Sequence, residues 1–123
     1  MKITNLTTEL PISTGDYSCP VRRTADILDG KWTTRIIREL LIGTRRYSEL
    51  QRGLPGISPK MLTSRLKMLE KNGVLKKTIY ACIPPKTEYD LTDLGKELEY
   101  VILAMAHYGN LLIGNERSSS KAG

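Results

Sequence analysis

The pattern of hydrophobic residues and helix-breaking residues predicts two helices in the first half of the chain. Pro20 begins the first helix and Gly30 ends it, because proline fits the first turn of a helix and glycine interrupts one. The second predicted helix ends at Gly43. Its apolar residues recur at helical spacing and are Trp32, Ile36, Ile37, Leu40 and Leu41.

Two more helices are predicted on either side of Pro55-Gly56. The segment Ser48-Glu49-Leu50-Gln51 has the S-x-x-Q form of a capping box, so we expect a short third helix to begin there. Ser58 is then the expected N-cap of a fourth helix, with Pro59 as its first residue. Asn72-Gly73 is a good stop for that helix.

After Gly73 the pattern changes from helical to extended. Residues 75–83 and 87–91 are rich in β-forming side chains, and Pro84-Pro85-Lys86 separates them, which predicts a β-hairpin. Thr92 is the expected cap of a long last helix. The apolar residues of that helix are Leu94, Leu98, Val101, Ile102, Met105 and Leu112.

The order of these elements predicts the fold. A short helix, a tight turn, a second helix and a β-hairpin make a winged helix-turn-helix. We therefore expect an α+β, mainly α domain over residues 19–114, with a two-stranded wing and a long C-terminal dimerisation helix. Residues 1–18 are expected to be a flexible arm and residues 115–123 a disordered tail.

Basic residues are concentrated in the middle of the chain. Residues 31–77 hold twelve of the nineteen Lys and Arg residues and three acids, a net of +9, while the rest has seven basic and ten acidic residues, a net of −3. Together these give the +6 of the whole chain. Such a distribution favours a polyanionic partner. A solvated basic surface explains the charge equally well, so charge alone does not decide.

The predicted fourth helix has two chemically different faces. Leu62, Leu66 and Leu69 fall within about 60° of one another at ~100° per residue, which makes a buried stripe. The opposite face carries Lys60, Thr63, Ser64, Lys67 and Lys71, and Arg65 lies at the boundary. In a helix-turn-helix the N-terminal half of this helix enters the major groove of DNA. A basic surface helix without a DNA partner is the alternative interpretation.

These considerations give a set of candidate DNA-binding residues. We expect Lys60, Thr63, Ser64 and Arg65 near base edges, and Lys67 nearer the backbone. Arg45, Arg46 and Lys86 are expected to flank the groove and contact phosphates. The complete predicted set is Arg45, Arg46, Ser58, Lys60, Thr63, Ser64, Arg65, Lys67 and Lys86.

An ordered set of short motifs over residues 19–109 resembles the HxlR-type transcriptional regulators. The matching segments are Cys19-Pro20, Gly30-Lys31-Trp32-Thr33, Arg46-Tyr47-Ser48-Glu49-Leu50, Gly56-Ile57-Ser58-Pro59-Lys60-Met61-Leu62-Thr63, Arg65-Leu66 with Leu69, Pro84-Pro85, Glu88-Tyr89, and Leu91-Thr92 with Gly95. Tyr47 stands where the family usually has Phe, Thr87 where Val is usual, and Tyr108-Gly109 where Trp-Gly is common. We interpret these three departures as packing substitutions.

The resemblance implies a winged-helix homodimer that binds operator DNA and represses or activates nearby genes. In such proteins the first and last helices form most of the dimer interface. The run Val101-Ile102-Leu103-Ala104-Met105-Ala106 fits this, because it is too apolar for a helix with one buried face. The residues expected at the interface are Leu98, Val101, Ile102, Met105 and Tyr108.

Cys19 is a candidate redox sensor. It precedes Pro20 at a predicted helix start, with Arg22 and Arg23 following, and both a helix N-terminus and nearby cations favour the reactive thiolate. The resemblance adds that many family members carry a matching cysteine, which in several senses oxidants or electrophiles. A small buried residue is the alternative. Cys82 is interpreted as structural, and an intersubunit disulfide between the two cysteines stays open.

Other functional classes find little support. His107 is the one histidine and has no evident catalytic partner, and the chain has no C-x-x-C pair, P-loop or G-x-G-x-x-G. We expect no enzyme activity, cofactor or metal site. Residues 1–18 lack a signal-peptide pattern and no stretch could span a membrane, so we expect a cytoplasmic protein. A protein-interaction module remains the alternative function, RNA binding is a weaker one, and a small-molecule or electrophile effector stays open.

Overall fold

The computed structural model describes the backbone of residues 19–122 and the side chains of residues 19–118. The arm expected at residues 1–18 lies outside this part. The elements in chain order are α2 (Pro20–Leu28), α3 (Thr33–Ile42), β1 (Arg45–Arg46), α4 (Tyr47–Gly53), α5 (Pro59–Lys71), β2 (Leu75–Tyr80), β3 (Lys86–Leu91), α6 (Asp93–Lys96) and α7 (Leu98–Ala122).

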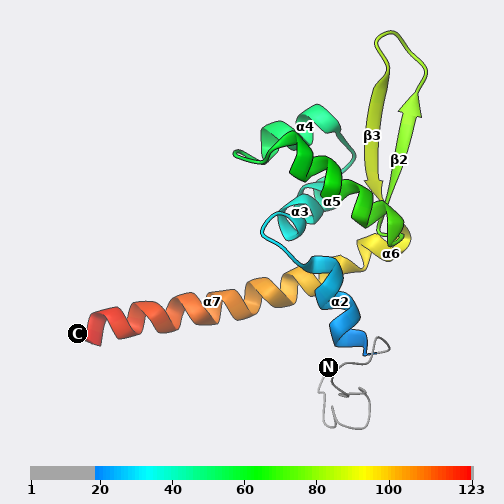
Figure 1. Ribbon diagram of the computed structural model, residues 1–123. Coiled ribbons are helices and arrows are strands. Elements are labelled where there is room, and N and C mark those ends of the chain that lie inside the picture. Colours follow the sequence, from blue (N-terminus) through cyan, green and yellow to red (C-terminus); the bar gives the residue numbers. More distant parts are fainter. Residues whose placement is uncertain (1–18, 123) are drawn as a thin grey trace.

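Three helices and a hairpin form the body of the molecule (Figure 1). Helices α3, α4 and α5 gather beside the base of β2 and β3, whose tip projects beyond them, while α7 passes α2 and extends away from this body. The described residues thus form a mainly helical winged helix-turn-helix with a long C-terminal helix, and the predicted fold class is confirmed.

The wing is part of a three-stranded antiparallel sheet with the strand order β1-β3-β2. The hairpin pairs Leu75 with Leu91 at its base and Tyr80 with Lys86 near its tip. On its other edge β3 pairs with β1, which the sequence did not predict. A two-residue strand carries no periodic pattern of its own, and its partner lies more than forty residues away in the chain.

The hydrophobic core joins the helices to the base of the sheet. Its buried residues include the predicted stripe of α5, Leu62, Leu66 and Leu69. The other buried members are Ile36, Ile37, Leu40, Leu50, Leu54, Ile57, Val74, Leu75, Tyr89 and Leu91. Burying each large apolar side chain contributes roughly 1.5–3 kcal/mol, so this stripe fixes which face of α5 points outward.

The beginnings of α4 and α5 differ in how well the sequence predicted them. Ser58 is the N-cap of α5 and accepts a hydrogen bond from the Met61 N–H at 3.0 Å, as predicted. The capping box expected at Ser48 is wrong, because α4 already begins at Tyr47. The Glu49 carboxylate accepts a hydrogen bond from the backbone N–H of Arg46 at 2.9 Å. The first turn of α4 is therefore capped at Arg46, two residues before the expected Ser48.

The long C-terminal helix begins and ends at later residues than the sequence predicted. Thr92 caps the short α6, accepting the Gly95 N–H at 3.1 Å, and the long helix α7 begins only at Leu98. At the other end α7 continues to Ala122, past the predicted boundary at residue 114. No proline follows Gly114, and Glu116 and Arg117 are good helix formers, so the helix continues past the Gly114-Asn115 pair.

Candidate nucleic-acid interface

The outward face of α5 brings four of the predicted DNA-binding residues together. Lys60, Thr63, Ser64 and Lys67 are exposed and, with Pro59, line one shallow open hollow. No carboxylate belongs to this group. The arrangement offers ammonium and hydroxyl donors on an exposed helix face, which suits the acceptors of base edges and phosphates.

Tyr47 adds a contact to this face that the sequence did not predict. Its hydroxyl lies 3.2 Å from the carbonyl oxygen of Pro59, to which it can donate, and 3.2 Å from Oγ1 of Thr63. The phenol therefore bridges the start of α4 to the first turns of α5. The signal was present in the sequence, since the resemblance places a phenylalanine at this position and only tyrosine has the hydroxyl.

Arg65 lies apart from the outward group. A Cβ atom built on Gly30 would be 3.0 Å from Nη2 of Arg65, so the guanidinium packs against the turn between α2 and α3. Its Nε is buried and has no hydrogen-bond partner among the described residues. The structure brings Arg65 to the flank of α5 rather than to the face that carries Lys60 and Ser64.

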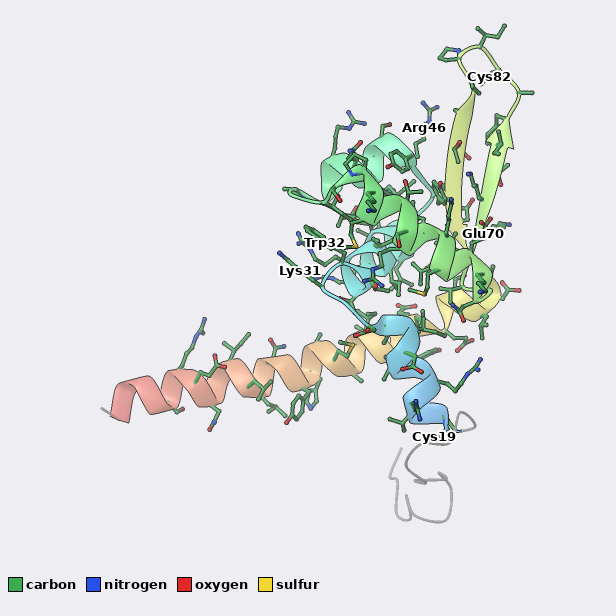
Figure 2. All side chains as sticks on the ribbon, in the orientation of Figure 1. Cys19, Lys31, Trp32, Arg46, Glu70 and Cys82 are labelled. Carbon is green, nitrogen blue, oxygen red and sulfur yellow. The ribbon has the colours of Figure 1, made fainter. Side chains whose placement is uncertain are left out.

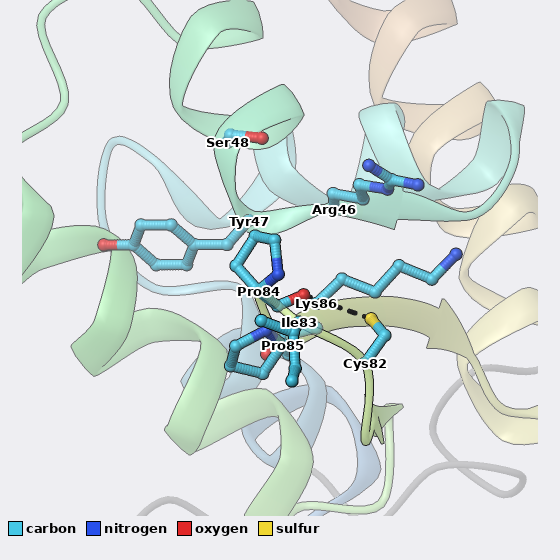
Figure 3. A pocket seen from close by; sticks show the side chains of 9 residues that line it. Arg46, Tyr47, Ser48, Cys82, Ile83, Pro84, Pro85 and Lys86 are labelled. Carbon is cyan, nitrogen blue, oxygen red and sulfur yellow. Dashed lines mark hydrogen bonds between the residues drawn. The ribbon is translucent and has the colours of Figure 1, made fainter.

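A cleft of about 680 Å³ separates the start of α4 from the tip of the wing (Figure 3). Arg46 and Ser48 line it on one side, and Cys82 and Lys86 line it on the other. The Cys82 Sγ donates to the Pro84 carbonyl at 3.1 Å, which is the dashed line in Figure 3. Two predicted phosphate contacts, Arg46 and Lys86, thus share one cleft beside α5.

The three predicted phosphate contacts differ in their partners. Lys86 Nζ lies 3.5 Å from Oε1 of Glu88 and 4.8 Å from the centre of the Tyr80 ring. A hydrogen bond to Glu88 and the charge of that carboxylate raise the pKa of Tyr80. Arg45 Nε lies 3.6 Å from Oε2 of Glu39, and the structure does not bring Arg45 into the cleft. Arg46 is the exposed cation of this flank.

The two cysteines occupy opposite ends of the molecule (Figure 2). Cys19 is the half-buried N-cap residue of α2, and its carbonyl accepts the Arg23 N–H at 2.9 Å. Cys82 is exposed at the wing. Both thiols are free. A bond between them within one chain does not fit this arrangement, and the intersubunit pairing stays a hypothesis.

The predicted dimer residues divide into two groups along α7. Leu98 and Ile102 pack against the chain's own core, and Val101 is half-buried. Met105 and Tyr108 remain 48% and 62% exposed. The other large apolar side chains exposed on α7 are Tyr100, Leu103, Leu111, Leu112 and Ile113. The outer part of the helix therefore presents apolar surface that the described chain does not cover.

Comparison with known proteins decides the family. The family model described as HxlR-like helix-turn-helix matches residues 27–117. The chain belongs to the HxlR-like helix-turn-helix family. An HTH-type transcriptional regulator of Synechocystis is 44% identical to it over 94 residues, which cover 76% of this chain and 70% of that protein. The resemblance inferred from the motifs is confirmed, and the chain is a transcriptional regulator of the helix-turn-helix type.

Solved structures of other transcriptional and redox regulators share the fold. A MarR-family transcriptional regulator from Porphyromonas gingivalis W83 aligns with a TM-score of 0.73 and 43% identity, covering 79% of this chain and 95% of that one. The redox regulator HypR in its reduced form aligns with a TM-score of 0.75 and 35% identity, covering 80% of this chain and 98% of that one. These relatives are named as regulators and not as enzymes.

Two features are absent from the part of the chain that the structure describes. None of its helices combines the length and apolarity that a membrane span requires. Within the same part of the chain, no three His, Cys, Asp or Glu side chains gather closely enough to hold a metal ion. The candidate site is thus a surface of donors on α5, flanked by the cleft at the wing.

Proposed function

We propose that this HxlR-like protein is a homodimeric regulator that binds operator DNA sequence-specifically, with α5 in the major groove. The observation that carries the proposal is the outward face of α5, where Lys60, Thr63, Ser64 and Lys67 stand exposed without a carboxylate. Lysine and hydroxyl side chains at this position can contact base edges and adjacent phosphates. The proposed place of action is the cytoplasm, where such a regulator meets its operator.

The homodimer is supported by the uncovered apolar side chains of α7. Met105, Tyr108 and Leu111 are about half exposed or more, on a helix that extends away from the body. Apolar patches of this kind on a protein surface mark interaction sites. A second copy of the chain is the proposed partner, since two copies would present two α5 helices to the two half-sites of one operator.

Response to oxidants through Cys19 is the proposed regulation. The thiol sits at the beginning of α2, half-buried and unpaired. Support also comes from HypR, which is named a redox regulator and has been solved in a reduced and an oxidised form. We propose that oxidation at Cys19 moves α2 and changes the spacing of the two recognition helices.

The first experiment compares two duplexes of equal length under reducing conditions. One covers the region upstream of the protein's own gene and the other is a shuffled sequence. We expect the protein to prefer the native duplex by roughly a thousandfold or more. Equal, weak binding to both duplexes at several salt concentrations would argue against specific recognition, and a complete lack of binding at low salt would favour a protein-interaction module.

A pair of matched variants locates the binding surface. Lys60→Ala combined with Lys67→Ala removes two cations from the outward face of α5. Lys76→Ala combined with Lys96→Ala removes two exposed cations that line another cleft, beside Asp90. We expect the first pair to lower operator affinity at least about tenfold more than the second. An equal effect of both pairs would mean that only the net charge matters.

A further inference from the structure

The side chain of Trp32 lies beside the turn that leads into α5. It is the chain's single tryptophan and lies half-buried in the turn between α2 and α3. A Cβ atom on Gly56 would be 3.8 Å from the Cη2 atom of the indole, so the ring reaches the turn that leads into α5. Gly56 has a φ of +93°, which favours glycine and fixes the shape of this turn.

Two cations lie over the Trp32 ring. Lys31 Nζ is 5.0 Å and Arg35 Cζ is 4.6 Å from the ring centre. Attraction to the electrons of the ring holds each of these cations beside the indole. Among the described residues neither Lys31 nor Arg35 takes part in an ion pair. Their positive charge is therefore available to an anion.

These cations lie on the flank of α5 that faces away from the wing. The contact of Thr63 with Tyr47 marks the flank toward α4 and the wing. The contact of Arg65 with Gly30 marks the opposite flank, next in sequence to Lys31. Figure 2 likewise places Lys31 and Trp32 on the far side of α5 from Arg46 and Cys82.

A helix in the major groove is bordered by two sugar-phosphate backbones, one on each side. The cleft with Arg46 and Lys86 lies where the backbone on the wing side would run. The other backbone would run past the opposite flank of α5. The cations on Trp32 are placed to meet it.

We propose that Lys31 and Arg35, held on the ring of Trp32, bind the phosphate backbone on the side of the groove opposite the wing. The inference rests on the proposed function and names a second contact of the same site with its DNA. Contacts to phosphates position the protein and carry no sequence information directly. The pair would therefore contribute affinity and salt dependence, while the residues on the outward face of α5 supply the base preference.

The test measures how operator affinity depends on salt. Each phosphate contact contributes about 0.9 to the slope of log affinity against log salt, and the proposed homodimer has two copies of each residue, so Lys31→Ala combined with Arg35→Ala should reduce the slope by about 3.6. The matched control is Lys76→Ala combined with Lys96→Ala, which removes the same charge elsewhere and should leave the slope nearly unchanged. Lys31→Ala alone, at an exposed position, should reduce the slope by about half as much.

Two more readouts separate a backbone contact from a loss of folding. The affinity loss of the Lys31 and Arg35 variant should be the same for the operator and for single-base variants of it, because phosphates carry no base information. Operator DNA should also change the emission of Trp32 in the wild type. At saturating DNA that change should be much smaller in the variant, and circular dichroism checks that the variant is folded.

The outcomes distinguish this contact from the function on which it rests. If the wild type prefers its operator but neither Lys31 variant changes the salt slope, the proposed backbone contact is wrong and the operator binding stands. If the wild type shows no preference for any native duplex, the proposed function is overturned, and the proposed contact with the phosphate backbone is overturned as well. A base-dependent loss in the variants would also contradict a phosphate contact.

Discussion

Gly95 lies where the chain closely approaches the backbone of Val74. A Cβ atom there would be 2.0 Å from the carbonyl oxygen of Val74, a distance that requires backbone movement. We expect Gly95→Ala to lower the free energy of unfolding by more than about 3 kcal/mol, because the clash falls at the base of the wing between α6 and β2. Denaturant unfolding of the purified variant measures the loss.

The control for this prediction is a glycine in the outer part of the last helix. Gly114 lies within α7, and a Cβ atom there meets nothing within 4 Å among the described residues. Gly114→Ala should keep the stability or raise it by up to about 1 kcal/mol, since alanine is the better helix former. Similar losses in both variants would mean that the close approach at Gly95 does not matter.

The hydroxyl of Tyr47 supports a second prediction at the residue scale. Tyr47→Phe removes the contacts to Pro59 and to Thr63 and keeps the ring. We expect stability to change by no more than about 1.5 kcal/mol, the range of one exposed hydrogen bond. The preference among operator base variants should change, because the Thr63 hydroxyl loses its partner. Titrations of wild type and variant against a panel of single-base operator variants measure this, and identical preferences would contradict it.

Individual side chains were predictable where they follow from helical periodicity. The buried stripe of α5 and the cap at Ser58 depend on residues within a few positions of each other, and both were found as expected. The direction of Arg65 was not predictable, because a helical wheel places it at a boundary and its actual neighbour, Gly30, is thirty-five residues away. The position of the Trp32 ring was not predictable for the same reason, because the ring lies against the distant turn at Gly56.

At the scale of elements, α7 carries apolar residues around most of its circumference. On one side of the helix, Leu98 and Ile102 pack against the core. Met105 is 48% exposed farther along the helix. Sequence periodicity alone could not tell which of these apolar residues face the chain's own core. That division depends on where α7 leaves the body of the molecule.

The exposed part of α7 gives a prediction about assembly. Met105→Glu places a charge in the proposed subunit interface, where burial without a partner is costly. We expect the variant to dissociate to monomers at concentrations at which the wild type is a dimer. Analytical ultracentrifugation measures the mass of each. Asn110→Glu is the control at an exposed polar position of the same helix, and unchanged mass in both variants would argue against an interface at Met105.

The boundaries of the elements show what local signals can miss. The sequence located the hairpin and four helices because proline, glycine and the change of period mark them. It did not predict β1 or the separation of α6 from α7, since both arise from contacts with remote parts of the chain. The start of α4 was missed because Glu49 closes the first turn against Arg46, an unusual N-cap residue.

At the scale of the whole molecule, the candidate DNA-binding surface and the proposed sensor are joined by a short path. Cys19 begins α2, and α2 ends at the turn that contains Gly30. Arg65 of α5 packs against that same turn. A displacement of α2 would therefore reach α5 through one side-chain contact as well as through the subunit interface. This arrangement gives the proposed redox response a physical route that does not require the chain to unfold.

The last prediction tests that route with an oxidant. Diamide should change operator affinity of the wild type by at least about fivefold, the lower range of typical coupling between two sites. Cys82→Ser should keep the response if diamide joins the Cys19 thiol to the Cys19 thiol of the second subunit in a disulfide, and Cys19→Ser should abolish it. Fluorescence titrations with operator DNA before and after oxidation measure each affinity, and added reductant should restore the original value. Loss of the response in both variants would identify a Cys19–Cys82 bond between subunits, whereas an undiminished response in Cys19→Ser would rule out sensing at Cys19.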